Sequence, residues 1–279
     1  LGAQGGLVGL RTRLALPDTA REFGRRLFGG QSAQAAERAS GQTADPLAVE
    51  GAVPPYAIPH LAVEHVPVRI GLPTGRLRGN AHGYTAFFTE SFIDELAHEL
   101  RREPLAFRMA MLGHDARLAE CLQRVASLAG WDGGASDSAQ GLACHCIGGG
   151  RIAVVARAER DDRGVHVNRI SAIADIGRIV NADIARQQIE GGLVFGLGLA
   201  LGASTEYAAG LPLAGRLRDL GLPVLADCPQ IEVDFVESDT PPADPGELGV
   251  AVVAPAIANA LFSATGLRFR RLPLLSEGL

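Results

Sequence analysis

The hydrophobic pattern of the first half of the chain predicts helices after an irregular N-terminal region. Residues 17–46 are rich in Arg, Ala, Ser and Gln without clear periodicity, and we expect a loop there. Four apolar residues at helical spacing predict an amphipathic helix over residues 89–100, with Glu90 and Asp94 facing solvent. The four are Phe92, Ile93, Leu96 and Leu100.

The pattern then adds helices and several strands, which together predict an α+β fold. Further helices are expected from Pro104 and over residues 116–129. After a Gly/Ser-rich break at residues 133–141, the sequence pattern favours strands. One more helix is expected from residue 183 to about 201, and Asn181 can cap it. Runs that favour strands are residues 62–70, 151–158, 165–174 and 230–236.

Near the C-terminus, one carboxylate precedes a long segment without charge. In PGELGVAVVAPAIANALFSATG, Ile257 and Leu261 fall at helical spacing, and Pro255 is expected in the first turn. A fold that buries this segment carries Glu247 toward a desolvated interior, where a carboxyl group becomes suited to taking protons. The alternative is an acidic loop residue that complements the helix dipole, and the local sequence leaves both open.

Composition and charge exclude several classes of protein. The 279 residues include no Lys, so lysine Schiff-base chemistry and a phosphate-loop lysine are absent. A net charge of −5, one Trp and three Tyr argue against a nucleic-acid partner. The longest uncharged stretches fall short of the roughly 18 to 20 apolar residues of a membrane span, so we expect no transmembrane segment.

The first residue is Leu, and no signal-peptide pattern follows it. We therefore expect a processed or split piece of a longer protein. Its location stays open between the bacterial cytoplasm and a periplasmic or inner-membrane-associated complex. A disulfide scaffold is not expected, because the four Cys lack framework spacing.

Two short motifs suggest binding chemistry. The sequence Cys144-His145-Cys146 invites a metal site, but adjacent strand positions point to opposite faces and the other Cys residues do not complete a ligand set. Gln188 begins the stretch QIEGGLVFGLG, whose glycines permit close approach of a backbone or a flat ligand. On sequence alone, a packing helix and a ligand-contacting helix are equally compatible with this stretch.

A resemblance decides between these two interpretations. Four segments carry it, within a match that runs from about Pro59 to the C-terminus: TGRLRGNAHGYTAFFTESFIDELA, DIGRIVNADIARQQIEGGLVFGLG, PQIEVDFVES and PGELGVAVVAPAIANALFSATGLRFRRLPL. In this order and at this spacing they resemble the large molybdenum subunit of the xanthine oxidase family. The resemblance is greatest to the isoquinoline 1-oxidoreductase and aldehyde dehydrogenase branch of that family.

The resemblance implies roles for individual residues. Glu247, at the family's Gly-Glu position, would be the base that deprotonates a molybdenum-bound hydroxyl, and Arg78 would orient substrate or transition-state charge. The residues implied to contact the cofactor are Gln188, Glu190, Gly191, Gly192 and Gly246. No side-chain metal ligand is expected, since in this family a pterin dithiolene holds the metal.

The resemblance further implies a multi-chain oxidoreductase. Residues 1–132 would end a first molybdopterin-binding domain and residues 133–279 would form a second. The enzyme would oxidise an aldehyde or N-heteroaromatic carbon with oxygen from water. Its cofactor would be molybdenum-molybdopterin in the cytosine dinucleotide form, shared with a chain that carries the N-terminal half. A 2Fe-2S small subunit, and a cytochrome or other acceptor, would take the electrons. Two alternatives are a non-catalytic scaffold or assembly subunit and a small-molecule binding module.

Overall fold

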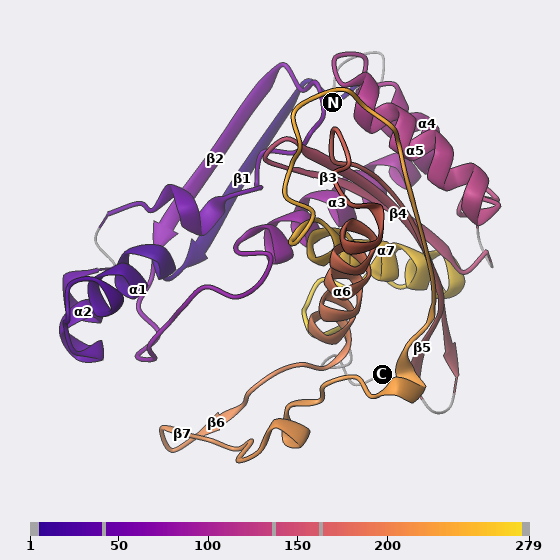
Figure 1. Cartoon of the computed structure of the whole chain (residues 1–279). Coiled ribbons are helices and arrows are strands. Elements are labelled where there is room, and N and C mark those ends of the chain that lie inside the picture. Colours follow the sequence, from indigo (N-terminus) through magenta and orange to yellow (C-terminus); the bar gives the residue numbers. More distant parts are fainter. Residues whose placement is uncertain (1–5, 41–42, 136–137, 162–163, 275–279) are drawn as a thin grey trace.

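The computed structural model describes residues 6–40, 43–135, 138–161 and 164–274. At its centre lies a four-stranded sheet with the strand order β3, β4, β5, β8 (Figure 1). The strands are β3 (Gln140–Ile147), β4 (Gly150–Asp161), β5 (Gly164–Asp175) and β8 (Gln230–Phe235). The first three are antiparallel neighbours, whereas β8 runs parallel to β5 after a helical crossover. This mixed sheet with its helices confirms the predicted α+β fold.

Helices cover both faces of the sheet (Figure 1). On one face lie α6 (Ala182–Leu201) and α7 (Leu248–Thr265). On the other lies α5 (Ala116–Ala129), with the short α4 (Pro104–Met109) beside it. The α3 helix (His82–Glu99) packs against α7. The predicted bounds of α5 and α6 are confirmed, including the Asn181 cap, whose Oδ1 accepts from the Ile184 amide at 3.0 Å.

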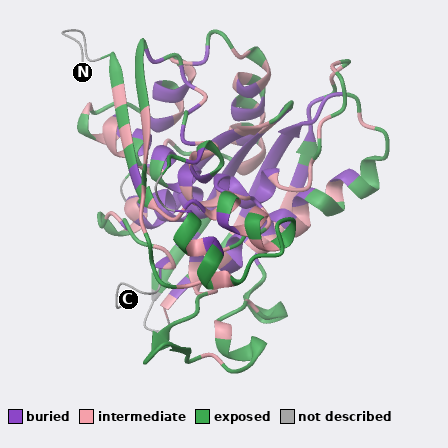
Figure 2. Ribbon diagram, turned by 90° about the vertical axis from the view of Figure 1, so that its left-hand side faces the viewer, coloured by how far each residue is buried: buried purple, intermediate pink, exposed green. Residues whose placement is uncertain are grey.

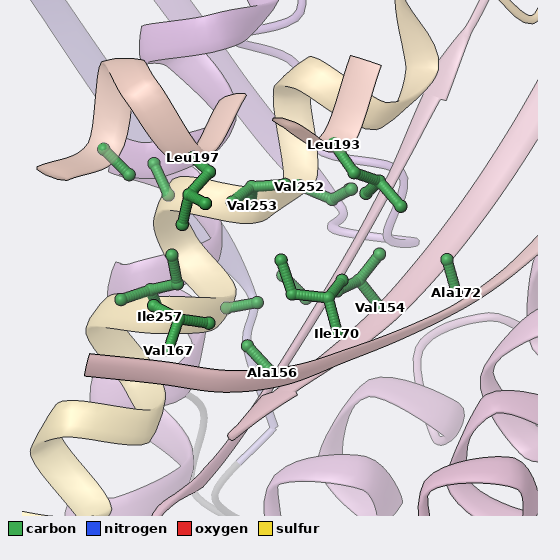
Figure 3. Close-up of a cluster of buried hydrophobic side chains, with 14 of the residues drawn as sticks. Val154, Ala156, Val167, Ile170, Ala172, Leu193, Leu197, Val252, Val253 and Ile257 are labelled. Carbon is green, nitrogen blue, oxygen red and sulfur yellow. The ribbon is translucent and has the colours of Figure 1, made fainter. Parts of the chain in front are cut away.

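The sheet is buried on both faces because its strands alternate between two apolar cores (Figure 2). Val154 and Ala156 of β4 face α6 and α7, where they meet Leu193, Leu197 and side chains of α7 (Figure 3). The intervening residue, Val155, faces the opposite core with α5. Full burial of each large aliphatic side chain contributes about 1.5–3 kcal/mol, so both cores stabilise the sheet.

Glycines allow α6 and α7 to cross at very short distance. A Cβ at Gly192 would lie 3.3 Å from the Gly249 Cα, and one at Gly249 would lie 2.7 Å from the carbonyl oxygen of Ile189. A Cβ at Gly196 would stand 3.0 Å from the Val250 oxygen. Gly192 and Gly196 of the QIEGGLVFGLG stretch therefore serve the packing of α6 against α7.

The N-terminal region contains helices where the sequence predicted a loop. After β1 (Gly9–Leu16) come α1 (Thr19–Leu27), α2 (Ala33–Ala39) and the 3-10 turn η1 (Pro46–Val49), and β2 (His60–Pro67) then pairs in parallel with β1. The loop prediction was wrong because these short helices bury almost no apolar stripe. The buried residue of α1 is Glu22, and that of α2 is Ala36.

The structure also contradicts part of the prediction for α3 (His82–Glu99), because two acidic residues expected at the surface are buried and one apolar residue is exposed. The helix begins at His82 rather than Thr89; Glu90 and Asp94 are buried, and Phe92 is 42% exposed. Glu90 accepts from Arg108 Nε at 3.1 Å, and Asp94 from Arg268 Nη2 at 2.7 Å. Both arginines lie outside α3, so the hydrophobic pattern of this helix alone could not predict the ion pairs.

The α7 helix begins directly after Glu247, as expected, but Pro255 lies inside it rather than in its first turn. By length and composition alone α7 would be long and apolar enough to cross a membrane. However, 83% of the helix is buried, with the sheet on one side and α6 and α3 around it. Such burial is typical of the core helix of a globular protein.

Between α6 and β8 the chain makes an arm away from the body, seen as the orange hairpin in Figure 1. It contains the short strands β6 (Tyr207–Ala208) and β7 (Leu211–Pro212) and two 3-10 turns, η2 (Leu217–Leu220) and η3 (Leu225–Asp227). Several large apolar residues of the arm are exposed, and exposed residues are green in the ribbon of Figure 2. The sequence analysis made no prediction for this segment.

Candidate functional site

Arg78 joins three parts of the chain that lie far apart in the sequence. Its Nε donates to the carbonyl oxygen of Gly246 at 2.7 Å, and its Nη2 donates to the carbonyl oxygen of Gln188 at 3.0 Å. The loop before α3 is thereby attached to both α6 and the turn before α7. Gly191 lies at the same place, since a Cβ on it would be 3.4 Å from Arg78 Nη1.

Glu247 occupies the N-cap position of α7 and is half-buried. Its Oε2 accepts a hydrogen bond from Asn80 Nδ2 at 2.8 Å. Asn80 and Arg78 belong to one loop, so the same loop holds both the side chain of Glu247 and the carbonyl group just before it. The helix N-terminus favours the negative charge of the carboxylate.

The turn before Glu247 lies beside an exposed amide side chain. Gln188 is exposed, and its Oε1 would lie 3.5 Å from a Cβ on Gly246, so an amide side chain and a bare backbone turn face the same space. Amide groups and backbone N–H groups suit the polar edge of a flat heterocycle. Among the described residues no group of three His, Cys, Asp or Glu lies close enough together to hold a metal ion.

Two of the predicted residues lie outside the cluster that Arg78, Asn80, Gln188, Gly246 and Glu247 form. Glu190 is half-buried on α6, and in the part of the chain that the structure describes no hydrogen bond ties it to Arg78 or Glu247. Gly192 is buried against Gly249 of α7, so the structure gives it a packing role, whereas Gly191 faces Arg78. The cofactor contacts of these residues stay predictions.

Two cavities flank the cluster and share Leu77, Leu199 and Ala203. The first, of about 310 Å³, is lined by Arg76, Arg78 and Asn80 among others. The second, of about 570 Å³, is largely apolar and lies between α6 and the arm. Space for a small molecule is therefore available on both sides of Leu77.

A pair of neutral histidines lies beside the cluster. His82 Nδ1 and His145 Nε2 are 2.8 Å apart, and His82 Nε2 lies 3.9 Å from Glu50 Oε1. Burial lowers the pKa of His145 to about 3, with a smaller effect from His82, and burial also lowers the pKa of His82. Cys144 and Cys146 beside His145 are both free thiols, and burial raises the pKa of each.

Sequence reasoning missed three residues that the fold brings to the site: Arg76, Asn80 and His82. Only Arg78 was selected from their loop. The one signal in the sequence was the Gly79-Asn80 pair, because Gly and Asn favour turns with a left-handed backbone conformation. Gly79 has φ 90° and Asn80 has φ 47°.

Comparison with known proteins supports the family resemblance. Residues 134–229 match the family described as a molybdopterin cofactor-binding domain. The chain is 30% identical over 239 residues to the isoquinoline 1-oxidoreductase subunit beta of Brevundimonas diminuta, covering 84% of this chain and 31% of that protein. It is 31% identical over 225 residues to the membrane-bound aldehyde dehydrogenase [pyrroloquinoline-quinone] of Gluconacetobacter polyoxogenes, covering 72% and 29%. The chain thus spans about a third of the length of these relatives.

The fold has solved counterparts. The aldehyde oxidoreductase of Desulfovibrio gigas aligns with a TM-score of 0.69 at 16% identity, over 82% of this chain and 44% of that one. At this identity the likeness concerns the fold alone. The matched domain and the curated relatives show that the chain carries a molybdopterin-binding domain of the kind found in the aldehyde and heterocycle oxidoreductases of the xanthine oxidase family.

Proposed function

We propose that this chain is part of the molybdenum subunit of an oxidoreductase that oxidises an aldehyde or N-heteroaromatic carbon, with Glu247 as its base. The observation that carries the proposal is the position of Glu247. Its carboxylate sits at the N-terminus of α7, bonded to Asn80, beside the turn that Arg78 ties to Gln188. A carboxylate fixed next to an exposed amide is placed to take a proton from a bound group.

Each residue of the cluster has a defined part in this proposal. When bound, the molybdenum cofactor would supply the oxygen and accept the electron pair of the oxidation. Glu247 takes the proton on its Oε1, since Oε2 is engaged by Asn80. The exposed amide of Gln188 and the turn at Gly246 would hold the pterin edge. Arg78 ties α6 to this turn, which keeps the residue that bears the amide close to the turn that precedes the carboxylate.

We further propose the finer features that the family resemblance implies. The transferred oxygen comes from water, the cofactor is the cytosine dinucleotide form, and the electrons leave through a 2Fe-2S subunit to a cytochrome or other acceptor. A chain with the N-terminal half of the subunit completes the cofactor site. The names of the relatives support a multi-chain assembly, since one of them is itself a subunit beta.

Glu247→Gln in the assembled enzyme tests the proposal. The substitution preserves shape and removes the base, so we expect turnover to fall by about 10²- to 10⁴-fold or more. Molybdenum content and the unfolding transition should not change. Dye reduction with a panel of aldehydes and N-heteroaromatics measures turnover, and elemental analysis measures the molybdenum content. Activity within a few-fold of the parent would remove Glu247 from the mechanism, and a native complex without molybdenum would favour the scaffold or binding-module alternatives.

The need for a partner chain has its own test. Residues 1–279 expressed alone should be insoluble or co-purify with other proteins, because large apolar side chains of the arm are exposed. Size-exclusion chromatography with light scattering measures the outcome. A soluble monomer that carries molybdenum and oxidises substrate would contradict the assembly proposed here.

A further inference from the structure

We propose that Asn80 is a positioning residue for Glu247, and that Arg76 fixes the direction in which the Asn80 amide points. The inference rests on the proposed role of Glu247 as a base and adds two residues to it. Asn80 Nδ2 donates to Glu247 Oε2 at 2.8 Å, and Asn80 Oδ1 accepts from Arg76 Nε at 2.8 Å. Arg76 Nη2 in turn donates to Glu50 Oε2 at 2.9 Å. The four side chains form one line of hydrogen bonds.

The chemistry of the partners allows only one orientation of this amide. A guanidinium group has only donors, so the Asn80 atom that faces Arg76 must be the carbonyl oxygen. A carboxylate has only acceptors, so the atom that faces Glu247 must be the NH₂ group. Both contacts agree on the same orientation. The amide therefore always presents a donor to Glu247, which holds the carboxylate in one orientation.

The backbone at Asn80 is adapted to this contact. Its φ of 47° lies in the left-handed region, which Asn tolerates better than most residues. The amide N–H of Asn80 donates to the carbonyl oxygen of Leu77 at 2.8 Å and closes a tight turn. At Gly79, a Cβ would lie 2.6 Å from Val250 Cγ1, so only glycine lets the loop approach α7 this closely. The loop thus holds Asn80 against the start of α7.

One oxygen of Glu247 remains available for chemistry. Asn80 engages Oε2, and no hydrogen bond reaches Oε1 from the residues that the structure describes. An oriented carboxylate with one held and one open oxygen can accept a proton in a defined direction. Loss of Asn80 should therefore lower the rate of the chemical step more than substrate affinity.

Asn80→Gly in the assembled enzyme tests this role. Glycine adopts the same φ without strain and removes the amide. We expect kcat to fall about tenfold or more with KM unchanged, since hydrogen bonds to charged groups are among the stronger ones. The pH profile of kcat/KM should also differ from that of the parent, because the proposed base loses its hydrogen-bond donor. Asn80→Asp, which places an acceptor against an acceptor, should change the profile further.

A second measurement does not depend on turnover. A water-soluble carbodiimide labels carboxyl groups in their protonated form, and peptide mass spectrometry follows Glu247 across a pH series in the complex prepared without cofactor. The labelling midpoint of Asn80→Gly should differ from that of the parent. An unchanged midpoint together with an unchanged pH profile would overturn the role of Asn80. If Glu247→Gln keeps its activity, the base assignment fails, while the labelling result still decides whether Asn80 acts on this carboxylate.

A double-variant comparison tests the part assigned to Arg76. Arg76→Ala should reproduce the Asn80→Gly shift in part, and adding it to Asn80→Gly should cause no further shift, since it acts only through the amide. Arg270→Ala is the matched control, because Arg270 pairs with Glu95 on the surface of α3, away from this line. Additive effects of Arg76→Ala and Asn80→Gly would overturn the role of Arg76.

Discussion

Two polar clusters bridge distant parts of this chain, and they differ mainly in their contact with solvent. The sealed cluster consists of Tyr56, Glu90, Asp94, Arg108 and Arg268. The open cluster consists of Arg76, Arg78, Asn80, Gln188 and Glu247. Both fasten the segments around α3 to the C-terminal half of the chain. Only the open cluster leaves an amide and a carboxylate oxygen available to a bound molecule.

The sealed cluster shows what burial does to charge. Burial alone lowers the pKa of Arg108, but the nearby Glu90 and other groups outweigh it and raise that pKa above its usual value. Burial likewise tends to raise the pKa of Asp94, yet the hydrogen bond with His98 and the charges of Arg108 and Arg268 hold it low. The charges of this cluster are thus fixed in place. A cluster that must exchange protons with a ligand cannot be built in this way, which is why we assign function to the open cluster.

The largest effect on stability should come from breaking the sealed cluster. Arg108→Met leaves Glu90 and Asp94 buried without their main cation, and such losses cost about 3–5 kcal/mol. Urea denaturation measures the change. A loss below about 1 kcal/mol would mean that water enters the cluster and that the two clusters do not differ as described.

The histidine pair should give the next largest effect, as a pH dependence. His145 is fully buried, and its folded pKa of about 3 lies below the ordinary 6.5. Between these values the unfolded chain binds a proton that the folded chain does not, so stability falls as pH falls, by up to about 1.4 kcal/mol per pH unit. Denaturation midpoints from neutral to mildly acidic pH should therefore fall less steeply in His145→Leu than in the parent. Parallel curves would contradict this.

Adjacent glycines of α6 provide a matched pair with a smaller effect. A Cβ at Gly192 meets the Gly249 backbone at 3.3 Å, so Gly192→Ala should overpack the crossing of α6 and α7 and cost about 1–3 kcal/mol. Gly191→Ala meets only the end of the Arg78 side chain, and the higher helix propensity of Ala should leave stability equal or higher. Thermal unfolding compares the two variants. Equal losses would show that both glycines pack protein.

The sequence predicted those parts of the molecule whose reasons are local. The α5 helix carries its own cap, since Asp115 accepts from the Leu118 amide at 3.1 Å, and it ends at Gly130 with φ 62°. The position of Glu247 before a charge-free helix could be predicted for the same reason. The domain boundary predicted at residue 133 remains a prediction.

What the sequence could not predict depends on pairings between distant segments. Glu90 appeared to be a solvent-facing residue because its partner Arg108 lies on another helix. Asn80 gave no sign of its role, because Glu247 is 167 positions away in the chain. Only the folded backbone brings these groups together. The resemblance to a known family implied a role for Glu247, but the hydrogen-bond partners of its side chain came from the structure.

The smallest effect on stability, and the sharpest contrast, should come from Arg78→Met. Arg78 donates to two carbonyl groups, as Arg108 does to buried acceptors, but Arg78 and Gln188 have contact with water. Water can replace the lost donors, so the free energy of unfolding should fall by less than about 1 kcal/mol, against about 3–5 for Arg108→Met. The same substitution releases the turn before Glu247, and in the assembled enzyme cofactor content or kcat should drop while the denaturation midpoint hardly moves. Urea denaturation, elemental analysis and dye reduction on both variants measure the contrast. If Arg78→Met destabilised the protein as much as Arg108→Met and left cofactor content and kcat unchanged, the open cluster would be structural like the sealed one, and its assignment as the functional site would fail.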